Sequence, residues 1–395
     1  MIVYTYAVYP LLVILASRLR RRREPGTGAP LPAVSVLISS HLEEDVIAEK
    51  IENTLASTYP KERLQILVAV DTDEDRTADI VRSYAGCGVE LSYSPSRQGK
   101  SAAIDRAMAL ASGDIVVFSD ANNMYEIDAI ERLAQAFDDP DVGVASGAKV
   151  ISGGDGSLGD SEGLYWRYED AIKRAESRLS SCTGFVGEIL AIRRSLYEPL
   201  PSSVLNDDFW IGMSIVRRGY RAVYVPAARS VERVSIDMAA ERVRRARIVA
   251  GRYQAMRHPV EILPRRNPVV LWQVVSHKFL RPLVPVFMML AAATNVHLLV
   301  RKMDGSSLSD RQRRAFTLAG GGQMLFYAAA LIGSKTEPQH RFIRKALYLP
   351  TYLASSNLAA LSGLVQHYRS KDLHTWQRVE RRNGMHTAEE RTHGR

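Results

Sequence analysis

Carboxylates gather at three places in the first third of the chain, each directly after a short apolar run. The three segments are Glu43-Glu44-Asp45, Asp71-Thr72-Asp73-Glu74-Asp75 and Asp120-Ala121-Asn122-Asn123. Any one of them would serve to cap a following helix, because Asp and Asn are favoured at that position. Brought together in one crevice, they would repel one another unless a cation lay among them. Oxygen ligands without histidine or cysteine favour Mg²⁺ or Mn²⁺ over zinc.

A glycine and a lysine stand together in the segment Arg97-Gln98-Gly99-Lys100-Ser101. The segment opens a helical pattern, so the glycine permits close backbone approach and the lysine lies near the positive end of the helix dipole. This combination suits a bound phosphate. The segment is not a P-loop, because the Gly-x-x-x-x-Gly-Lys spacing is absent.

The elements that must position these residues alternate in type from Val34 onward. The short apolar runs are Val34 to Ser39, Ile66 to Val70 and Ile115 to Ser119, and the amphipathic stretches are Ile47 to Ala56, Thr77 to Tyr84 and Lys100 to Ala111. This alternation predicts βαβ units, and therefore an α/β fold with a mostly parallel, Rossmann-like sheet flanked by helices. Ligands of such sheets bind beyond the carboxyl ends of the strands, which is where the acids lie.

Both ends of the 395-residue chain are apolar. Residues 1–17 are uncharged and arginines cluster at 18–23, the reverse of the order in a secretory signal, so we expect residues 1–23 to be an uncleaved membrane anchor and 24–31 a linker. Near the other end, three stretches approach the roughly 20 residues that cross a bilayer. They are Pro282 to Val300, Ala315 to Gly333 and Ala346 to Gln366.

The predicted organisation is a soluble domain between membrane segments. We expect the domain at residues 32–258, an interfacial helical region at 259–281, transmembrane helices at 282–367 and a basic tail at 368–395. The positive-inside rule keeps the arginine cluster, and hence the soluble domain, in the cytoplasm of a multi-pass protein. Three later crossings would put the basic tail outside, so either one stretch lies in the membrane plane or the tail breaks the rule.

The net charge of +9 and the two cysteines narrow the class of protein. Cys87 and Cys182 form neither a disulfide framework nor a metal-ligand pattern, which is typical of a reducing compartment. The positive charge would suit anionic lipid, a phosphorylated substrate, nucleic acid or merely a solvated surface. Because the arginine patches adjoin apolar segments, we expect membrane lipids and no nucleic acid as partners.

Taken in order, these residues resemble glycosyltransferase family 2, whose catalytic domain has the GT-A fold, a Rossmann-like sheet with a metal-binding acidic motif. The resemblance covers about Pro32 to Met256. Residues 276–282, Ser-His-Lys-Phe-Leu-Arg-Pro, are similar to the membrane-attached branch of the family.

The resemblance implies a site for a nucleotide-sugar donor. Glu43 would recognise the base, Asp71 would hold the base or ribose, and Lys100 would lie near the phosphates. Phe118-Ser119-Asp120-Ala121-Asn122 resembles the DxD motif, with Asp120 as the ligand of Mg²⁺ or Mn²⁺ and Asn122 in place of the second acid. The metal would neutralise charge on the departing diphosphate.

The acceptor side follows later in the chain. Gly184, Phe185 and Gly187 resemble the acceptor-side loop of the family, although an ordinary glycine-rich turn would read the same. Asp207-Asp208 resembles the family's acidic pair, which implies that Asp208 is the general base and that Asp207 raises its proton affinity. Attack from the face opposite the diphosphate inverts the anomeric carbon. The alternative is a pair of helix-capping acids.

Arginines at positions 242–247 stand where processive members of the family carry Gln-x-x-Arg-Trp, but the Gln and Trp are missing. Processive extension is therefore not indicated. Arg245 and Arg247 would grip the donor diphosphate, or else belong to a basic amphipathic helix on the membrane.

We expect an inverting, metal-dependent glycosyltransferase that moves a sugar, most often from a UDP-sugar in this family, to a polysaccharide or lipid-linked acceptor at the cytoplasmic membrane face. Whether it needs partner subunits is open. Two other classes remain: a sugar-nucleotide nucleotidyltransferase, which needs neither a membrane anchor nor a late acidic pair, and a non-catalytic membrane scaffold that binds nucleotide as a signal.

Overall fold

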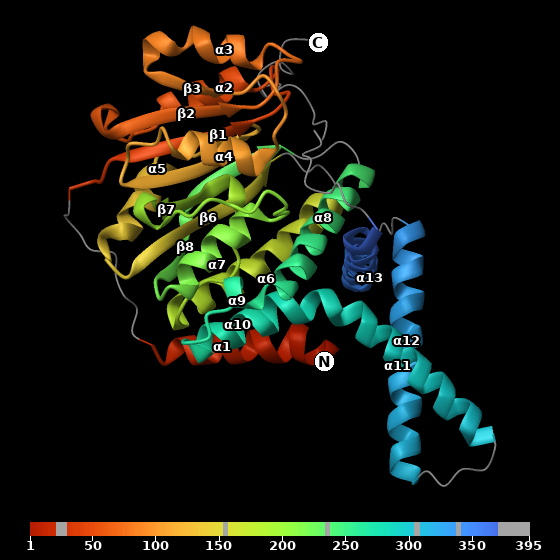
Figure 1. Ribbon diagram of the computed structural model, residues 1–395. Helices are drawn as coiled ribbons and strands as arrows, with labels where there is room; N and C mark the ends of the chain where they lie inside the picture. Colours follow the sequence, from red (N-terminus) through yellow and green to blue (C-terminus); the bar gives the residue numbers. More distant parts are fainter. Residues whose placement is uncertain (21–29, 153–156, 234–237, 304–308, 337–340, 370–395) are drawn as a thin grey trace, which may run out of the picture.

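The computed structural model describes residues 1–20, 30–152, 157–233, 238–303, 309–336 and 341–369. The arginines at 21–23, most of the predicted linker and nearly all of the predicted tail lie outside these ranges. An eight-stranded sheet with order β3-β2-β1-β4-β7-β6-β8-β5 forms the centre of the globular part (Figure 1). Its strands are β1 (Val34–Ser40), β2 (Leu64–Val70), β3 (Val89–Tyr93), β4 (Ile115–Asp120), β5 (Asn123–Tyr125), β6 (Val142–Ser152), β7 (Leu190–Arg193) and β8 (Arg221–Arg233).

The half of the sheet built from β1 to β4 is parallel, as the alternating pattern predicts. The register pairs Ser40 with Val70 and Ser39 with Asp120, so the carboxyl ends of β1, β2 and β4 meet at one edge. The connections are α2 (Ile47–Leu55), α3 (Thr77–Ser83) and α4 (Lys100–Met108), each within a few residues of its predicted bounds. Strand β7 then runs antiparallel to both β4 and β6, which makes the complete sheet mixed.

Helices cover both faces of the sheet, because the strands are apolar on both sides. Leu37, Leu67 and Phe118 pack with α4 and with α7 (Asp207–Arg217) on one face. Val36, Val68 and other alternate strand residues pack with α2, α3 and α5 (Ala129–Gln135) on the other. Such two-sided burial is typical of parallel strands and anchors the carboxyl-end edge firmly.

The second half of the globular part adds two long helices, α6 (Ser157–Leu179) and α8 (Met238–Arg257). Helix α6 leads into the 182–187 segment and then into β7, and α8 follows β8. In Figure 1 both helices lie between the sheet and the helices of the chain ends.

In Figure 1 the helices of the two chain ends lie below and to the right of the sheet. The N-terminal helix consists of η1 (Tyr4–Val8) and α1 (Tyr9–Arg18) and lies along α6, with Tyr9 and Val13 fully buried. Above it lie α9 (Pro259–Ile262), α10 (Pro268–Gln273) and η7 (Val274–Phe279), which continue into α11 (Leu280–Met303). The last helices are α12 (Asp310–Lys335) and α13 (Arg341–Arg369).

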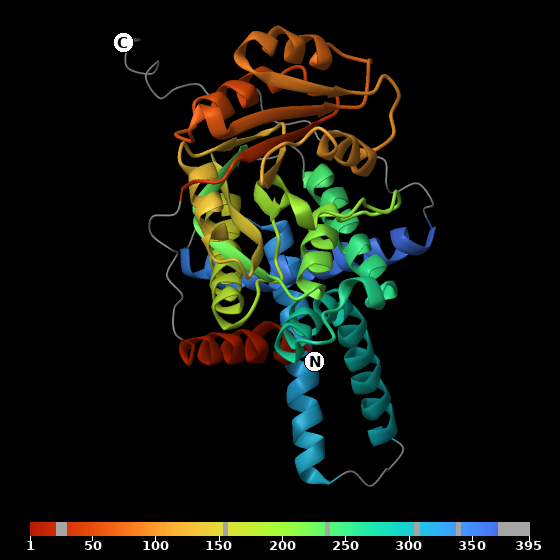
Figure 2. The same ribbon diagram turned by 60° about the vertical axis from the view of Figure 1, so that its left-hand side comes forward.

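Two helical segments among the described residues are long and apolar enough to cross a membrane, Pro268–Leu298 and Asp310–Lys335. Figure 2 shows α11 and α12 descending side by side from the globular part, while α1 and α13 lie across that direction. The third predicted stretch belongs to α13, which does not meet this criterion and packs along α8 instead. Two of the three predicted stretches therefore lie in helices that meet this criterion, and the one in α13 does not.

Candidate active site

The acids at the strand ends differ in what they do locally. Asp75 accepts bonds from the backbone N–H of Thr77 (3.1 Å) and from its hydroxyl (2.6 Å), so it caps α3. Asp71 is buried and instead accepts a bond from the N–H of Gly99 at 2.9 Å, while His41 Nδ1 lies 3.4 Å from its other oxygen. Asp71 thus joins the end of β2 to the start of α4.

Gly99 has φ of +90°, which side chains other than glycine rarely adopt. That conformation turns its N–H towards Asp71 and starts α4 at Lys100. The sequence pattern suits this segment to a phosphate, and in the structure the Gly99 N–H binds Asp71. Leu42, just after β1, also has a positive φ of 57°, a strained conformation at the same edge of the sheet.

Glu43 is buried beside this edge, and its backbone N–H donates to the Thr77 hydroxyl at 3.1 Å. The predicted base-recognition residue therefore lies next to the α3 cap and near the end of β2.

Lys100 connects the donor-side and acceptor-side acids. Its ammonium lies 3.0 Å from Asp120 Oδ1 and 3.1 Å from Asp207 Oδ2. Burial alone would lower the pKa of Lys100, but the two carboxylates outweigh it and raise that pKa above its ordinary value. The lysine is therefore a fixed positive charge between β4 and the start of α7.

Asp208 lies beside this ion-pair network, and its Oδ1 accepts a bond from the N–H of Phe209 at 2.7 Å. Burial raises the pKa of Asp208, and the charge of Asp207 raises it further, whereas Arg252 and Lys100 act in the opposite direction. Neither acid occupies the N-cap of α7, which is Asn206. A half-buried carboxylate with raised proton affinity is what a general base requires.

Asn122 follows Asp120 at the tip between β4 and β5, and its buried Oδ1 has no hydrogen-bond partner among the described residues. A carboxylate and an orphaned amide oxygen suit Mg²⁺ or Mn²⁺, which completes its shell with phosphate oxygens and water. Within the described ranges no group of three or more His, Cys, Asp or Glu side chains forms a ready metal site. The residues fit a metal brought in with a diphosphate, rather than one held by protein alone.

The predicted acceptor-side loop reaches the acidic pair. A Cβ added at Gly187 would lie 3.2 Å from Asp208 Cβ, so the loop backbone runs directly past this residue. Phe185 packs against Phe209, with ring centroids 6.3 Å apart, and touches Gly212, where a Cβ would meet its ring at 2.4 Å. The start of α7 and this loop are therefore one packed unit.

Helix α8 also carries an arginine near the acids that the sequence analysis did not single out. The Arg245 guanidinium lies 5.5 Å from the ring centroid of Tyr352 on α13, and Arg247 is half-buried on the same helix. Arg252 instead stacks on Phe209 at 4.1 Å and favours the ionised form of Asp208. A diphosphate grip by Arg245 and Arg247 stays a prediction. Arg252 stands seven residues after Arg245, and this spacing puts both arginines on one face of a helix. That shared face was the signal in the sequence that could have pointed to Arg252.

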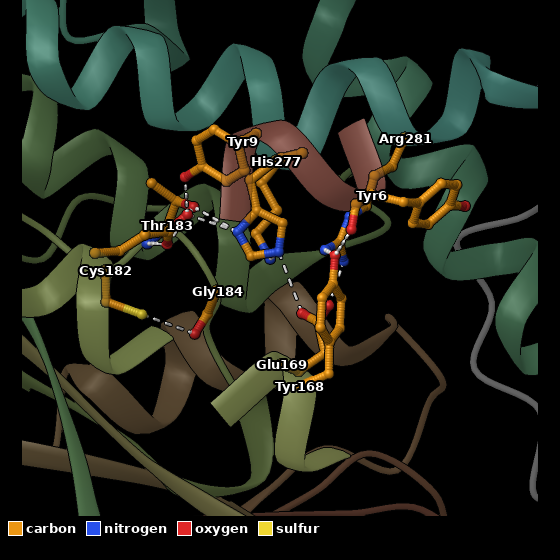
Figure 3. Close-up of polar contacts among 11 residues, drawn as sticks. Tyr6, Tyr9, Tyr168, Glu169, Cys182, Thr183, Gly184, His277 and Arg281 are labelled. Carbon is orange, nitrogen blue, oxygen red and sulfur yellow. Dashed lines mark hydrogen bonds and ion pairs between the residues drawn. The ribbon is translucent and has the colours of Figure 1, made fainter. Parts of the chain in front are cut away.

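A buried polar cluster between α6 and η7 was also missed from sequence. Glu169 and Glu176, seven residues apart on one face of α6, each lie within ion-pair distance of His277. Figure 3 shows Glu169 beside the His277 ring. Their spacing places both on one helix face, but the sequence does not say that this face is buried.

Comparisons with known proteins agree with this arrangement. The family model described as Glycosyl transferase family 2 matches residues 35–200. A probable glycosyltransferase, YdaM, of Bacillus subtilis (strain 168) is 29% identical over 211 residues, and an N-acetylglucosaminyltransferase of Rhizobium meliloti (strain 1021) is 28% identical over 225 residues. These matches cover 50% and 52% of this chain and the same shares of the relatives, so the chain spans about half the length of the curated relatives it matches.

Among solved structures, the mannosyltransferase PcManGT from Pyrobaculum calidifontis, in complex with GDP-Man and Mn²⁺, superimposes with a TM-score of 0.66 at 23% identity. The superposition covers 91% of this chain and 96% of that one, so the shared fold includes helices beyond the sheet. The mixed sheet and its flanking helices agree with the fold of that structure, and the segment matched by the family model lies within them. Residues 35–200 are therefore similar to the glycosyl transferase family 2 model, and the chain shares its fold with that mannosyltransferase.

Proposed function

We propose that this protein is an inverting, metal-dependent glycosyltransferase that moves a sugar from a nucleotide-diphosphate donor to a polysaccharide or lipid-linked acceptor at the membrane. One observation carries the proposal. The Lys100 ammonium contacts Asp120, the proposed donor-side acid, and Asp207, the neighbour of the proposed base. Residues from β4, α4 and α7 thereby meet at one centre, as transfer between two substrates requires.

In the proposed reaction Asp208 takes the proton of the acceptor hydroxyl. The acceptor oxygen forms its bond to the anomeric carbon as the bond from that carbon to the diphosphate breaks, and the nucleoside diphosphate leaves. Attack on the face opposite the leaving group inverts the anomeric configuration. Lys100 stabilises the negative charge that develops on the diphosphate. Asp120 and Asn122 would hold Mg²⁺ or Mn²⁺, which would supply further neutralisation of that charge.

The other proposed donor contacts surround this centre. Asp71 and Glu43 are buried at the ends of β2 and β1, on the side where ligands of such sheets bind. We assign them to the base and ribose. Arg245 and Arg247 remain proposed diphosphate contacts, and Arg252 joins the proposal as the arginine whose charge acts on Asp208. Gly184, Phe185 and Gly187 are proposed to line the acceptor side.

A UDP-sugar is the proposed donor, and UDP-N-acetylglucosamine is the first to test. A relative named N-acetylglucosaminyltransferase supports this choice. GDP-mannose is the second donor to test, because the solved structure with the same fold contains it together with Mn²⁺.

We further propose that the protein crosses the membrane twice, through α11 and α12, and that its N-terminal helix lies in the membrane plane. The five residues of η1 and ten of α1 would extend roughly 22 Å as a helix, less than the ~30 Å hydrocarbon core. One face is buried on α6, whereas Leu11, Leu12 and Leu15 are exposed on the other. A helix of this design suits the lipid interface.

Membranes containing the protein provide the test. Incubated with radiolabelled UDP-N-acetylglucosamine or GDP-mannose and Mn²⁺, they should incorporate label into lipid or polymer and release the nucleoside diphosphate, and EDTA should stop both. Synthesis of a nucleotide sugar from a sugar phosphate and a nucleoside triphosphate would instead indicate a nucleotidyltransferase. Donor binding without turnover of any nucleotide sugar would indicate a scaffold.

A further inference from the structure

Glu176 is fully buried, and its two carboxylate oxygens bind two different parts of the molecule. Oε1 accepts a 2.5 Å bond from the Tyr9 hydroxyl of α1 and lies 2.6 Å from His277 Nδ1 of η7. Oε2 accepts bonds from the N–H of Thr183 at 3.0 Å and from its hydroxyl at 2.9 Å. The membrane-proximal helices thus use one oxygen, and the acceptor-side loop uses the other (Figure 3).

The Oε1 side belongs to a larger polar cluster. His277 Nε2 lies 3.2 Å from Glu169, which also pairs with Arg281. Tyr9 packs on Trp272 of α10, with ring centroids 5.0 Å apart. Burial would raise the pKa of Glu176, but His277 and its hydrogen bond outweigh that effect and hold the pKa below its ordinary value. Glu176 is therefore a charged acceptor whose bonds are strong and directional.

The loop that Oε2 binds continues to Asp208, the proposed base. From Thr183 the loop continues through Phe185, which packs on Phe209, to Gly187, whose backbone passes Asp208 at van der Waals distance. Two hydrogen bonds tie the ends of this loop to the sheet, from the Cys182 N–H to Ala222 O at 2.8 Å and from the Val186 N–H to Ser146 Oγ at 3.0 Å. Thr183, between these two anchors, takes its position from Glu176.

We infer that Glu176 is a positioning residue for the acceptor. It sets the 182–187 loop, and through it the acceptor hydroxyl at Asp208, relative to the helices that lie against the membrane. The inference rests on the proposed function. A carboxylate is needed, because only two acceptor oxygens satisfy donors on both sides; an amide would present N–H₂ to one of them.

Its test separates transfer from hydrolysis of the donor by water. Hydrolysis needs the donor site but no positioned acceptor, so Glu176→Gln should lower the ratio of transferred to free sugar about 10-fold to 100-fold, the cost of a misplaced reactant. The KM for the donor should stay within about twofold. Membranes with radiolabelled UDP-N-acetylglucosamine, or GDP-mannose if only that is turned over, give both products in one assay.

Variants that each remove one hydrogen bond to Glu176 keep the test decisive if Glu176→Gln does not fold. Thr183→Val removes only the bond from the Thr183 hydroxyl to Glu176, and Tyr9→Phe removes only the bond from the Tyr9 hydroxyl. Both variants should lower the ratio of transferred to free sugar, whereas Thr183→Ser keeps the hydroxyl and should keep the wild-type ratio. Tyr59→Phe is the matched control, since it removes a buried tyrosine bond to Pro32 O elsewhere and should leave the ratio unchanged.

The outcomes distinguish the two proposals. If the wild type turns over neither donor, the proposed function fails and the positioning role fails with it. If the wild type is active but Thr183→Val and Tyr9→Phe keep its ratio, the positioning role alone is wrong. A parallel loss of transfer, hydrolysis and donor affinity would likewise overturn it, because that pattern marks general structural damage.

Discussion

At the scale of single residues, positively charged side chains of the site lie close to its aspartates. Lys100 contacts Asp120 and Asp207, and Arg252 acts on Asp208 from α8. The lysine is part of the resting network, so a diphosphate that arrives with a divalent cation would exchange partners with it rather than add to bare carboxylates. Each acid therefore has a separable role that substitution can expose.

Asp208→Asn should lower turnover about 10²-fold to 10⁴-fold, the usual contribution of a general base. Donor binding should persist, because Asp208 faces the acceptor loop rather than the Asp120 side. Label transfer and calorimetry with UDP and Mn²⁺ measure the two effects. Asp128→Asn, at an aspartate paired with Arg132 on α5, should keep wild-type turnover. Near-normal turnover of Asp208→Asn would remove Asp208 from the mechanism.

Asp120→Ala should abolish the Mn²⁺-dependent part of UDP binding, because it removes the carboxylate that we assign to the metal. Calorimetry with and without Mn²⁺ measures this part directly. Asp79→Ala, which removes an exposed aspartate from α3, is the control and should bind as the wild type does. Equal affinities for Asp120→Ala and wild type in Mn²⁺ would contradict the metal site.

The pH dependence should report on Asp208. Its pKa is raised by burial first and by Asp207 second, and the base works only when ionised, so kcat/KM should fall as pH drops through this raised pKa. Asp207→Asn removes the second cause and should move the acid limb to lower pH, whatever it does to the maximum rate. A pH profile of label transfer gives the midpoint. A limb that stays in place or moves to higher pH would contradict this coupling.

At the scale of elements, the packing of α13 on α8 fixes the helix that carries Arg252. A Cβ added at Gly363 of α13 would lie 2.6 Å from Ala246 O and 2.9 Å from Val249 Cβ, both on α8. The two backbones approach this closely only because position 363 has no side chain. Helix α13 therefore holds α8 in position by close backbone packing, and the apolar composition of α13 does not reveal this contact.

Gly363→Ala should lower the stability of the protein by about 1–3 kcal/mol, as overpacking usually does, because α13 must move away from α8. Thermal unfolding in detergent measures the change. Gly321→Ala is the matched control on α12, where an added Cβ meets nothing within 4 Å and the helical preference of alanine should be neutral or stabilising by up to about 1 kcal/mol. Equal melting temperatures for the two variants would contradict the close contact.

At the scale of the whole molecule, the proposed two crossings and in-plane N-terminal helix would place both chain ends on the side of the catalytic domain. This arrangement would resolve the conflict over the basic tail, because the tail would then stay on the cytoplasmic side that the positive-inside rule favours. Epitope tags fused at each end should be accessible only after permeabilisation. Asp310→Cys, at the start of α12, should react with an impermeant maleimide on intact cells, whereas the exposed native Cys87 should not. A surface-accessible N-terminal tag would show that α1 crosses after all.

Much of the donor side was predictable because it depends on local sequence. The strands at β1, β2 and β4, the helices between them and the acids at their ends follow from residue period and turn chemistry, and parallel strands bring their carboxyl ends together by rule. The sequence pattern placed Gly99 directly before a helix, and the structure gives that residue a positive φ of 90° at the start of α4. The mixed half of the sheet was less predictable, since β7 is only four residues long and its direction is set by its neighbours.

The sequence by itself determined which residues stand at the strand ends and at the start of α7, because a strand end or helix start is encoded within a few residues. The tertiary structure alone decided which arginine of α8 faces Asp208, that Glu176 is buried between a loop and two helices, and that α13 braces α8. These outcomes depend on which helix faces meet across long sequence separations. A helical period assigns residues to a face, but only packing decides what that face touches.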